Sequence, residues 1–311
     1  MRYIDPTEED AKIARNRNYA WETPPPPIPE SEIAETIETD AVIVGGGISG
    51  LAAAARCTQL GVNVIVLEKT NGFVAHGGHV ASVGSDTQRE NGVFIDKAQF
   101  ARDWIRVSGS RVNEDLLWIF VNRSEEAYHW FLELGGEHVK SILFGGYYRG
   151  PDFTEYPGTH LVVRTENSKY RFNGAFLMCE VLQETMLTGG GAIFRNTRAE
   201  QLERDAEGRI TSVIAKCEDG KYRRYAGTRG IVLATGDIGA DRDMLEHFCP
   251  IGMIPTHNGY TPDGINTGDG HKMGRWVGGE FETAPWAVSL HLIGYADYCF
   301  FFLHVNRQGN R

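Results

Sequence analysis

The sequence has 311 residues and a formal net charge of −10 at neutral pH. That length allows one large domain or two ordinary domains, each with a real hydrophobic core. Hydrophobic residues make up 41% of the chain and charged residues 23%, as in an ordinary globular protein. An acidic surface gains no counterion release on meeting nucleic acid or an anionic membrane, which argues against both as main partners.

The five cysteines are scattered and include no C-x-x-C pair. This spacing argues against zinc, iron–sulfur and c-type haem sites, so we expect no metal and a reducing compartment. The first twenty residues contain no apolar run that would serve as a secretory signal. No later run reaches the length of a membrane span, and the apolar stretch 299–305 has the length of a core strand. These patterns predict a cytoplasmic protein.

Residues 1–38 are acidic and rich in proline, with four consecutive prolines from Pro24 to Pro27. Such a composition favours extended conformations and cannot build a core. We therefore predict an extended or disordered leader, with a recognition tail as the alternative.

From Thr39 the chain is predicted to form a strand, a helix and a second strand that ends at Glu68. Between the first strand and the helix lies a G-x-G-x-x-G turn made by Gly45, Gly47 and Gly50. Such glycines allow a sharp turn, a close approach to a pyrophosphate and close helix–strand packing, and the phosphates bind at the helix N-terminus. A carboxylate placed like Glu68 accepts hydrogen bonds from ribose hydroxyls. The motif predicts a dinucleotide site and does not by itself distinguish FAD from NAD.

The rest of the chain alternates helices and strands. Asn113 is a predicted N-cap and Gly135-Gly136 a helix stop. Helices are predicted over 96–107, 113–134, 174–187, 242–248 and within 267–279, strands over 192–196 and 230–236, a β-meander over 199–226, and an irregular glycine- and tyrosine-rich region over 141–172.

The segment HGGHVASVGS, residues 76–85, resembles the fumarate reductase/succinate dehydrogenase flavoprotein family, which includes 3-ketosteroid dehydrogenases and urocanate reductase-like enzymes. In that family two glycines, a polar residue, small residues and another glycine wrap the flavin ring. The connection from Glu68 is a few residues longer here than is usual. No second G-x-G-x-x-G stands in strand–helix context, which disfavours an NAD-linked enzyme of the disulfide-reductase kind. The residues of this segment that match are Gly77, Gly78, His79, Val80, Ser82 and Gly84.

Three later motifs follow the family's order. Ala199 follows a segment similar to the family's adenine-side segment, and Ala234-Thr235-Gly236 matches its A-T-G-G turn except that Asp237 replaces the last glycine. Residues 267–270 match its T-G-D-G motif, which taken alone is a helix-opening turn with Asp269 as cap. Besides residues 76–85, the resemblance implies FAD contacts at Gly45, Gly47, Ser49, Gly50, Glu68, Lys69, Ala199, Ala234, Thr235, Gly236 and Asp269.

The resemblance implies an α/β fold, with a Rossmann-like FAD-binding domain of parallel sheet plus β-meander and the start of a smaller capping domain. The last residues, 303–311, are similar to the family's V-N-x-x-G-x-R segment, after which the family continues with a long portion that carries the proton-donating arginine. We therefore expect a truncated chain whose main proton donor lies beyond residue 311. The expected ranges are 39–140 and 174–280 for the FAD-binding domain, 141–173 for a substrate-side insertion and 281–311 for the incomplete capping domain.

The implied function is an FAD-dependent oxidoreductase that reduces or forms a C=C bond conjugated to a carboxylate or ketone, by hydride transfer through flavin N5. His291 falls within one position of the family's substrate-binding histidine and is the catalytic candidate. Leu292 and Ile293 replace the Pro-Thr of the fumarate branch, which favours a larger or more apolar unsaturated acid or ketone over a C4-dicarboxylate. Weaker candidates for polarising the substrate are His160, Arg149, Arg164, Tyr147, Tyr148 and Tyr156.

Two further predictions depend on the same resemblance. Because Gly77-Gly78 precedes His79, as in the non-covalent branch, we expect FAD to be bound without a covalent bond. The alternative to a complete enzyme is a flavin-bearing subunit or partial domain that passes electrons to a partner. The electron donor or acceptor is left open.

Overall fold

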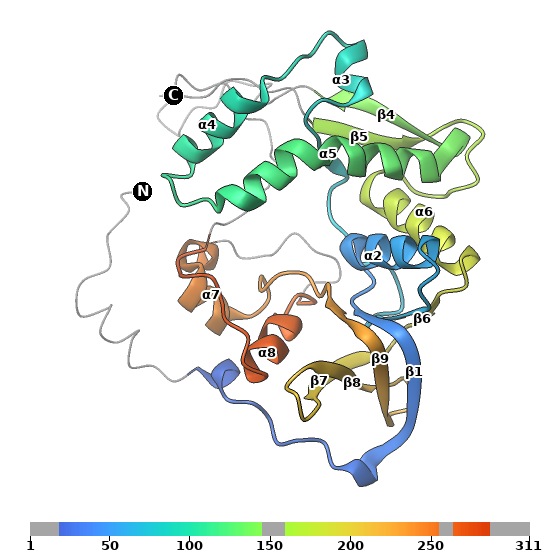
Figure 1. Ribbon diagram of the computed structural model, residues 1–311, viewed down its shortest axis with the longest axis vertical. Helices are drawn as coiled ribbons and strands as arrows, with labels where there is room; N and C mark the ends of the chain where they lie inside the picture. Colours follow the sequence, from blue (N-terminus) through green and yellow to red (C-terminus); the bar gives the residue numbers. More distant parts are fainter. Residues whose placement is uncertain (1–18, 145–158, 255–263, 287–311) are drawn as a thin grey trace, which may run out of the picture. The chain divides into compact units, whose positions relative to one another are not determined.

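The structure is a computed structural model that describes residues 19–144, 159–254 and 264–286. The described residues divide into two compact units, one formed by 19–75 with 183–254 and 264–286, and the other by 76–144 with 159–182 (Figure 1). The sequence-based boundaries at 140 and 174 differ from this division. The short strand that follows residue 78 belongs to the second unit, since it pairs with the strand at 159–164 and not with the large sheet.

The first unit is built on a six-stranded sheet in the order β6-β2-β1-β9-β8-β7. β6, β2, β1 and β9 pair in parallel, whereas β9, β8 and β7 form an antiparallel meander. The predicted parallel sheet plus β-meander is therefore confirmed, although the last meander strand and the strand at 230–236 form one continuous strand, β9. The strands are β1 (Ile33–Val44), β2 (Val64–Leu67), β6 (Ala192–Phe194), β7 (Arg198–Arg204), β8 (Ile210–Lys216) and β9 (Tyr222–Leu233).

The core of this unit lies where the parallel strands are most apolar. All four residues of β2 and the last four of β1 are buried, as expected for strands covered on both faces. The register pairs Val44 with Leu67 on one side and with Leu233 on the other, so three strands end at the same edge. The helices and 3-10 turns are α2 (Ile48–Gln59), α7 (Arg242–Phe248), α8 (Asp269–Trp276), η1 (Ala20–Glu22), η2 (Glu30–Glu32) and η4 (Pro250–Met253).

The described part of the predicted leader contributes to this unit. β1 begins at Ile33, and its first residues pair with Tyr222 to Ala226 of β9. Tyr19 and Trp21 are 4% and 5% exposed, and the indole of Trp276 donates to the Trp21 carbonyl at 2.8 Å. Main-chain pairing with β9 holds residues 33–38 in the sheet, although the hydrophobic pattern of the sequence did not predict a strand there.

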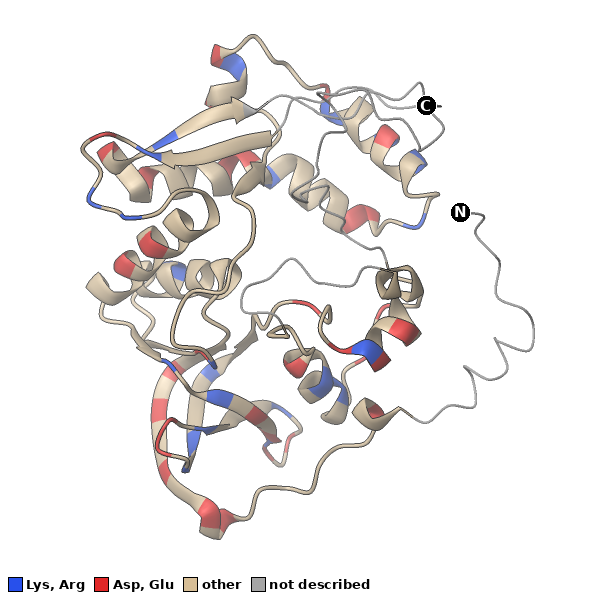
Figure 2. Cartoon of the chain, turned by 180° about the vertical axis from the view of Figure 1, so that it is seen from behind, with Lys and Arg blue, Asp and Glu red and all other residues tan. Residues whose placement is uncertain are grey.

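Complementary charges line the ladder between β1 and β9. Figure 2 shows acidic bands along β1 and basic bands on the strands beside it. Arg223 lies 3.4 Å from Glu35, and Arg229 lies 3.7 Å from Asp40. Exposed pairs of this kind each contribute less than about 1 kcal/mol, so they favour this pairing without dominating it.

The second unit combines helices with a three-stranded antiparallel sheet in the order β3-β5-β4. The predicted N-cap is confirmed, since the Asn113 side chain accepts from the Leu116 amide at 3.2 Å. Part of the region predicted to be irregular forms β4 and β5, and α3 was not predicted from the sequence. The elements are β3 (His79–Ala81), α3 (Asp86–Glu90), α4 (Lys97–Val107), α5 (Glu114–Gly135), η3 (Gly136–His138), β4 (Val139–Phe144), β5 (Thr159–Arg164) and α6 (Gly174–Thr188), the last helix continuing past the division at residue 182.

Among the described residues, no helix is both long and apolar enough to cross a bilayer, and no group of three or more His, Cys, Asp or Glu side chains could hold a metal ion. The strand expected at 299–305 and most of the expected capping segment lie outside the described residues.

Candidate cofactor site

The glycine turn connects β1 to α2 at the carboxyl edge of the parallel strands. Gly45 has a φ of +110°, and a Cβ there would lie 2.2 Å from the Ala234 carbonyl oxygen. A Cβ on Gly50 would lie 1.9 Å from the Gly45 carbonyl oxygen. Both positions therefore require glycine, and the turn packs directly against the residue that follows β9.

The start of α2 leaves amide groups available to a ligand. The first amides of an α-helix have no acceptor within the helix. Gly47 is the N-cap and supplies no side-chain cap, while Ser49 is exposed in the first turn. These amides and the positive end of the helix dipole form an anion site suited to a pyrophosphate.

Glu68 follows β2 and is only 5% exposed. One carboxylate oxygen, Oε2, accepts from the Gly46 amide at 2.7 Å. The other, Oε1, accepts from the amide and the hydroxyl of Thr70, each at 2.8 Å. A carboxylate offers about four lone-pair positions, so Oε2 keeps capacity for a ribose hydroxyl.

The A-T-G and T-G-D-G motifs lie together in this unit. A Cβ on Gly270 would lie 2.2 Å from the Thr235 hydroxyl oxygen, so the turn after β9 contacts the first turn of α8. Gly236, with a φ of +78°, lies against the side chain of Asn266. The approach brings Asp269, the first residue of α8, to the edge that carries the glycine turn.

Asp269 receives hydrogen bonds from three side chains. Lys69 Nζ lies 3.0 Å from its Oδ2, while an Arg198 guanidinium nitrogen at 3.1 Å and the Thr267 hydroxyl at 2.7 Å bond to its Oδ1. Burial opposes ionisation of Asp269, but the charge of Lys69, the Thr267 and Lys69 hydrogen bonds and the charge of Arg198 outweigh it and lower the carboxyl pKa. Asp269 is therefore held as a carboxylate.

The segment before Ala199 runs beside the Glu68 loop. The Thr197 amide donates to the Glu68 carbonyl at 2.9 Å, and the Asn196 amide donates to the Thr70 carbonyl at 3.2 Å. Ala199 itself is a buried residue of β7, 7% exposed. Arg198 and Thr70 were not predicted from the sequence as site residues, although Arg198 stands directly before Ala199 in the adenine-side motif.

The second unit contains the other glycine-rich segment, residues 76–85. Gly78 has a φ of +134°, and a Cβ there would lie 2.4 Å from the Cα of Gly174 at the start of α6. The Gly77 carbonyl accepts from the Ala175 amide at 3.4 Å. The paired glycines thus let this segment touch the backbone of a helix terminus.

The remaining residues of this segment lie in β3 and the turn after it. His79 is exposed and Val80 half-buried, and they pair with Leu161 and His160 of β5. Ser82 is 1% exposed, and its hydroxyl has no hydrogen-bond partner among the described residues. Gly84 adopts a φ of +91°.

Of the residues predicted to polarise the substrate, only His160 and Arg164 lie within the part of the chain that the structure describes. His291, Tyr147, Tyr148, Arg149 and Tyr156 all lie outside the described residues. His160 is fully buried and its ring nitrogens bond to Ser85 and to the Val80 carbonyl, which removes it from the substrate candidates. Arg164 is exposed at the end of β5.

The described residues fit the adenosine diphosphate part of FAD. The first unit supplies uncapped helix amides, a turn without side chains and a buried carboxylate with hydrogen-bonding capacity. In the second unit, the buried Ser82 hydroxyl belongs to the segment that the family resemblance assigns to the flavin ring. Buried hydroxyls in native proteins nearly always have a partner, so this one fits a ligand contact.

Comparison with known proteins agrees with this arrangement. Residues 40–297 match the sequence profile of the "FAD binding domain" family. The chain is 22% identical to urocanate reductase of Eggerthella lenta over 284 residues, covering 89% of this chain and 44% of that protein. It is 25% identical to fumarate reductase of Schizosaccharomyces pombe over 280 residues, covering 83% of this chain and 50% of that protein. The chain spans about half the length of the curated relatives it matches.

Two solved structures share the fold. A 3-ketosteroid-Δ4-(5α)-dehydrogenase from Rhodococcus jostii, solved with 4-androstene-3,17-dione, matches 80% of this chain and 55% of its own with a TM-score of 0.67 and 23% identity. A flavocytochrome c3 fumarate reductase in an open conformation matches 84% of this chain and 45% of its own, with a TM-score of 0.62 and 19% identity.

Proposed function

The chain belongs to the FAD binding domain family, and from that premise we propose that it holds FAD non-covalently within an oxidoreductase that reduces or forms C=C bonds. The bond acted on is conjugated to a carboxylate or ketone. The observation that carries the proposal is the meeting of four motif segments at one edge of the first unit's sheet. These segments are the glycine turn, the Glu68 loop, the A-T-G turn and the T-G-D-G helix start.

Each group in this arrangement has a role in the proposal. The amides at the start of α2 bind the pyrophosphate, and Glu68 accepts from a ribose hydroxyl. Lys69 and Arg198 hold Asp269 ionised and oriented toward the cofactor, and residues 77–84 contact the flavin ring. When bound, the flavin supplies hydride transfer at N5. His291 polarises the substrate by donating a hydrogen bond to its carboxylate or ketone oxygen.

The substrate class in this proposal is an unsaturated acid or ketone larger or more apolar than a C4-dicarboxylate. The departures after His291 favour it. The relatives of this chain are named for urocanate and digoxin and also for fumarate, so the preference for a larger substrate depends on those departures. The main proton donor is proposed to lie beyond residue 311, and a cytoplasmic location stays a prediction from the cysteine pattern. The alternative is a flavin-bearing part that passes electrons to a partner.

The test uses the whole protein that contains this chain, both with its native sequence (the unvaried protein) and as the Glu68→Gln variant. The unvaried protein is expected to purify yellow or to take up added FAD, and Glu68→Gln to bind FAD about tenfold or more weakly, because an amide nitrogen replaces one acceptor oxygen. Glu207→Gln, which changes an exposed residue of a meander turn, is the matched control. A correctly folded protein that takes up no FAD contradicts the proposal.

Substrate class and the role of His291 are tested on the reduced holoprotein. Reoxidation of the flavin is followed with fumarate, urocanate and an enone steroid. We expect the larger substrates to react faster than fumarate, and His291→Ala to slow reoxidation about a hundredfold without changing the flavin spectrum. FAD binding with no reaction toward any of them, but with rapid electron transfer to an artificial acceptor, favours the alternative.

A further inference from the structure

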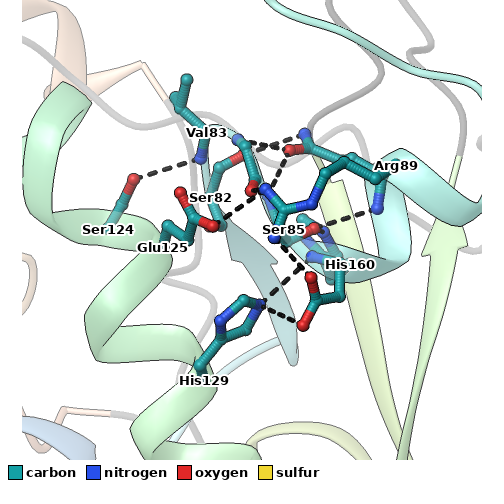
Figure 3. A network of polar contacts seen from close by, with 11 residues as sticks. Ser82, Val83, Ser85, Arg89, Ser124, Glu125, His129 and His160 are labelled. Atoms are coloured by element: carbon teal, nitrogen blue, oxygen red, sulfur yellow. Dashed lines mark hydrogen bonds and ion pairs between the residues drawn. The ribbon is translucent and has the colours of Figure 1, made fainter.

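The turn at residues 82–85 of the second unit is held by side chains at five of its backbone N–H and C=O groups. Gln88, which is fully buried, donates through Nε2 to the Ser82 carbonyl at 2.9 Å. Its Oε1 accepts from the Gly84 amide at 2.6 Å and from the Ser85 amide at 2.9 Å. One glutamine side chain thus closes both ends of the turn. Figure 3 shows Val83, Ser85 and Arg89 in the polar contacts of this turn.

Two neighbours complete this support. The Ser124 hydroxyl of α5 accepts from the Val83 amide at 3.1 Å. Arg89 donates to the Gly84 carbonyl and forms an ion pair at 2.9 Å with Glu125, which is also on α5. The turn is therefore tied to α3 and α5 as well as to its own residues.

A buried histidine holds the turn from the β5 side. The Val80 carbonyl can only accept a hydrogen bond, so Nδ1 of His160, 3.0 Å away, carries the proton. In the neutral ring Nε2 is then an acceptor, and the Ser85 hydroxyl donates to it at 2.6 Å. The same hydroxyl accepts from the Gln88 amide at 3.0 Å. The hydrogen bonds thus connect β3, through His160 and Ser85, to the first turn of α3.

This network surrounds a residue with unused hydrogen-bonding capacity. The Ser82 hydroxyl is buried and has no partner among the described residues, while the Ser82 carbonyl is fixed by Gln88. Because the backbone of this turn is fixed by surrounding side chains, the Ser82 hydroxyl is positioned before any ligand binds. Binding then has a smaller entropic cost, since the turn does not have to be ordered first.

Resting on the proposed function, we propose that His160 is a positioning residue for the flavin. It acts through Ser85 and the Val80 carbonyl, and it fixes residues 80–85 so that the Ser82 hydroxyl and nearby amides meet the polar edge of the flavin ring. His160 itself does not touch the cofactor in this proposal. The turn is built for the ring in advance, and FAD binding does not have to order it.

The test compares four variants of the whole protein. Asn at position 160 places an amide nitrogen where Nδ1 stands and keeps the bond to Val80, whereas Gln places an amide oxygen where Nε2 stands and keeps the bond to Ser85. We expect His160→Asn and Ser85→Ala to weaken FAD binding about tenfold and to change the flavin absorbance spectrum. We expect His160→Gln and Ser85→Thr to stay within about threefold of the unvaried protein, since both retain the link between the ring and the turn.

The flavin midpoint potential is the second readout, because a merely structural loss would not move it. If a variant weakens the binding of only the oxidised or only the reduced flavin, a tenfold loss of affinity shifts the midpoint potential by about 30 mV, because the flavin couple transfers two electrons. Ser212→Ala is the control, since it removes a buried hydroxyl that bonds to Glu203 in the meander. It is expected to leave affinity, spectrum and potential unchanged.

The outcomes separate this inference from the proposed function. If the unvaried protein takes up no FAD, the proposed function fails. If it binds FAD and Ser85→Ala leaves affinity, spectrum and potential unchanged, the role of His160 alone is overturned. If Ser85→Ala does not fold, the two His160 variants decide, and failure of His160→Gln to fold as well would show a structural network and overturn the inference.

Discussion

Lys69 and Asp269 form an ion pair at 3.0 Å although 200 residues separate them in the sequence. The pair joins the loop after β2 to the first turn of α8, the two elements that carry the Glu68 and T-G-D-G motifs. Lys69 Nζ also donates to the Ile265 carbonyl at 2.5 Å, so the lysine is held at both ends of the segment before α8. One side chain thus couples the two motifs.

Lys69→Met should destabilise the first unit, because it leaves the largely buried Asp269 carboxylate with one cation fewer. Lys69 is 24% exposed and Asp269 13%, so solvent screens part of the loss. We expect the free energy of unfolding to fall by about 1–2 kcal/mol, which is less than the loss caused by breaking a fully buried ion pair. Urea denaturation measures it. Arg123→Met, which removes an exposed pair with Glu126, is the control and should cost less than about 1 kcal/mol.

The pH dependence of Asp269→Asn tests the charge of the same site. The pKa of Asp269 is lowered in the folded protein, so its stabilising effect is present above the unfolded pKa of about 4 and is lost as pH falls through the folded pKa. The difference in unfolding free energy between the unvaried protein and Asp269→Asn should therefore be largest near neutral pH and shrink in acid. Urea denaturation across this range measures the difference. A gap that stays constant would show that the carboxylate charge is not what stabilises the unit.

Gly50→Ala tests the close approach in the glycine turn. The new methyl group would lie 1.9 Å from the Gly45 carbonyl oxygen, which is backbone and cannot move aside cheaply. We expect a loss of roughly 3 kcal/mol in unfolding free energy, together with loss of FAD uptake. Gly72→Ala in the following loop is the matched control, since a Cβ there meets nothing within 4 Å. Equal stability of both variants would contradict this account of the turn.

Local signals predicted much of the fold. Asp96, Asn113 and Asp241 each precede a helix and accept a hydrogen bond from an amide in its first turn. The G-x-G-x-x-G motif placed the first strand, helix and second strand, and the turns of the meander are equally local. The early start of β1 at Ile33 was missed because its partner, β9, lies nearly two hundred residues later. Pairing between segments so far apart in the sequence gives no local signal that predicts it.

The candidate site shows the same limit. Glu68 and Asp269 stand in recognisable motifs, so their positions at the sheet edge were predictable. The cations that hold Asp269 were not, because their contacts depend on loops brought together only in the folded chain. The sequence suggested His160 as a substrate group, whereas its burial and its bond to Ser85 give it a supporting place in the second unit.

His79 gives a prediction about how the cofactor is attached. It is exposed in β3, where its backbone pairs with Leu161, and Gly77-Gly78 precedes it as in the non-covalent branch of the family that the sequence resembles. An imidazole can donate or accept a hydrogen bond at the flavin edge without forming a covalent bond. We expect His79→Asn to bind FAD within about threefold of the unvaried protein, since Asn offers comparable hydrogen bonds there. Acid precipitation of the unvaried holoprotein should give a yellow supernatant and a colourless pellet. Flavin fluorescence that remains with the denatured chain, and that is lost in the His79→Asn variant, would show the prediction to be wrong.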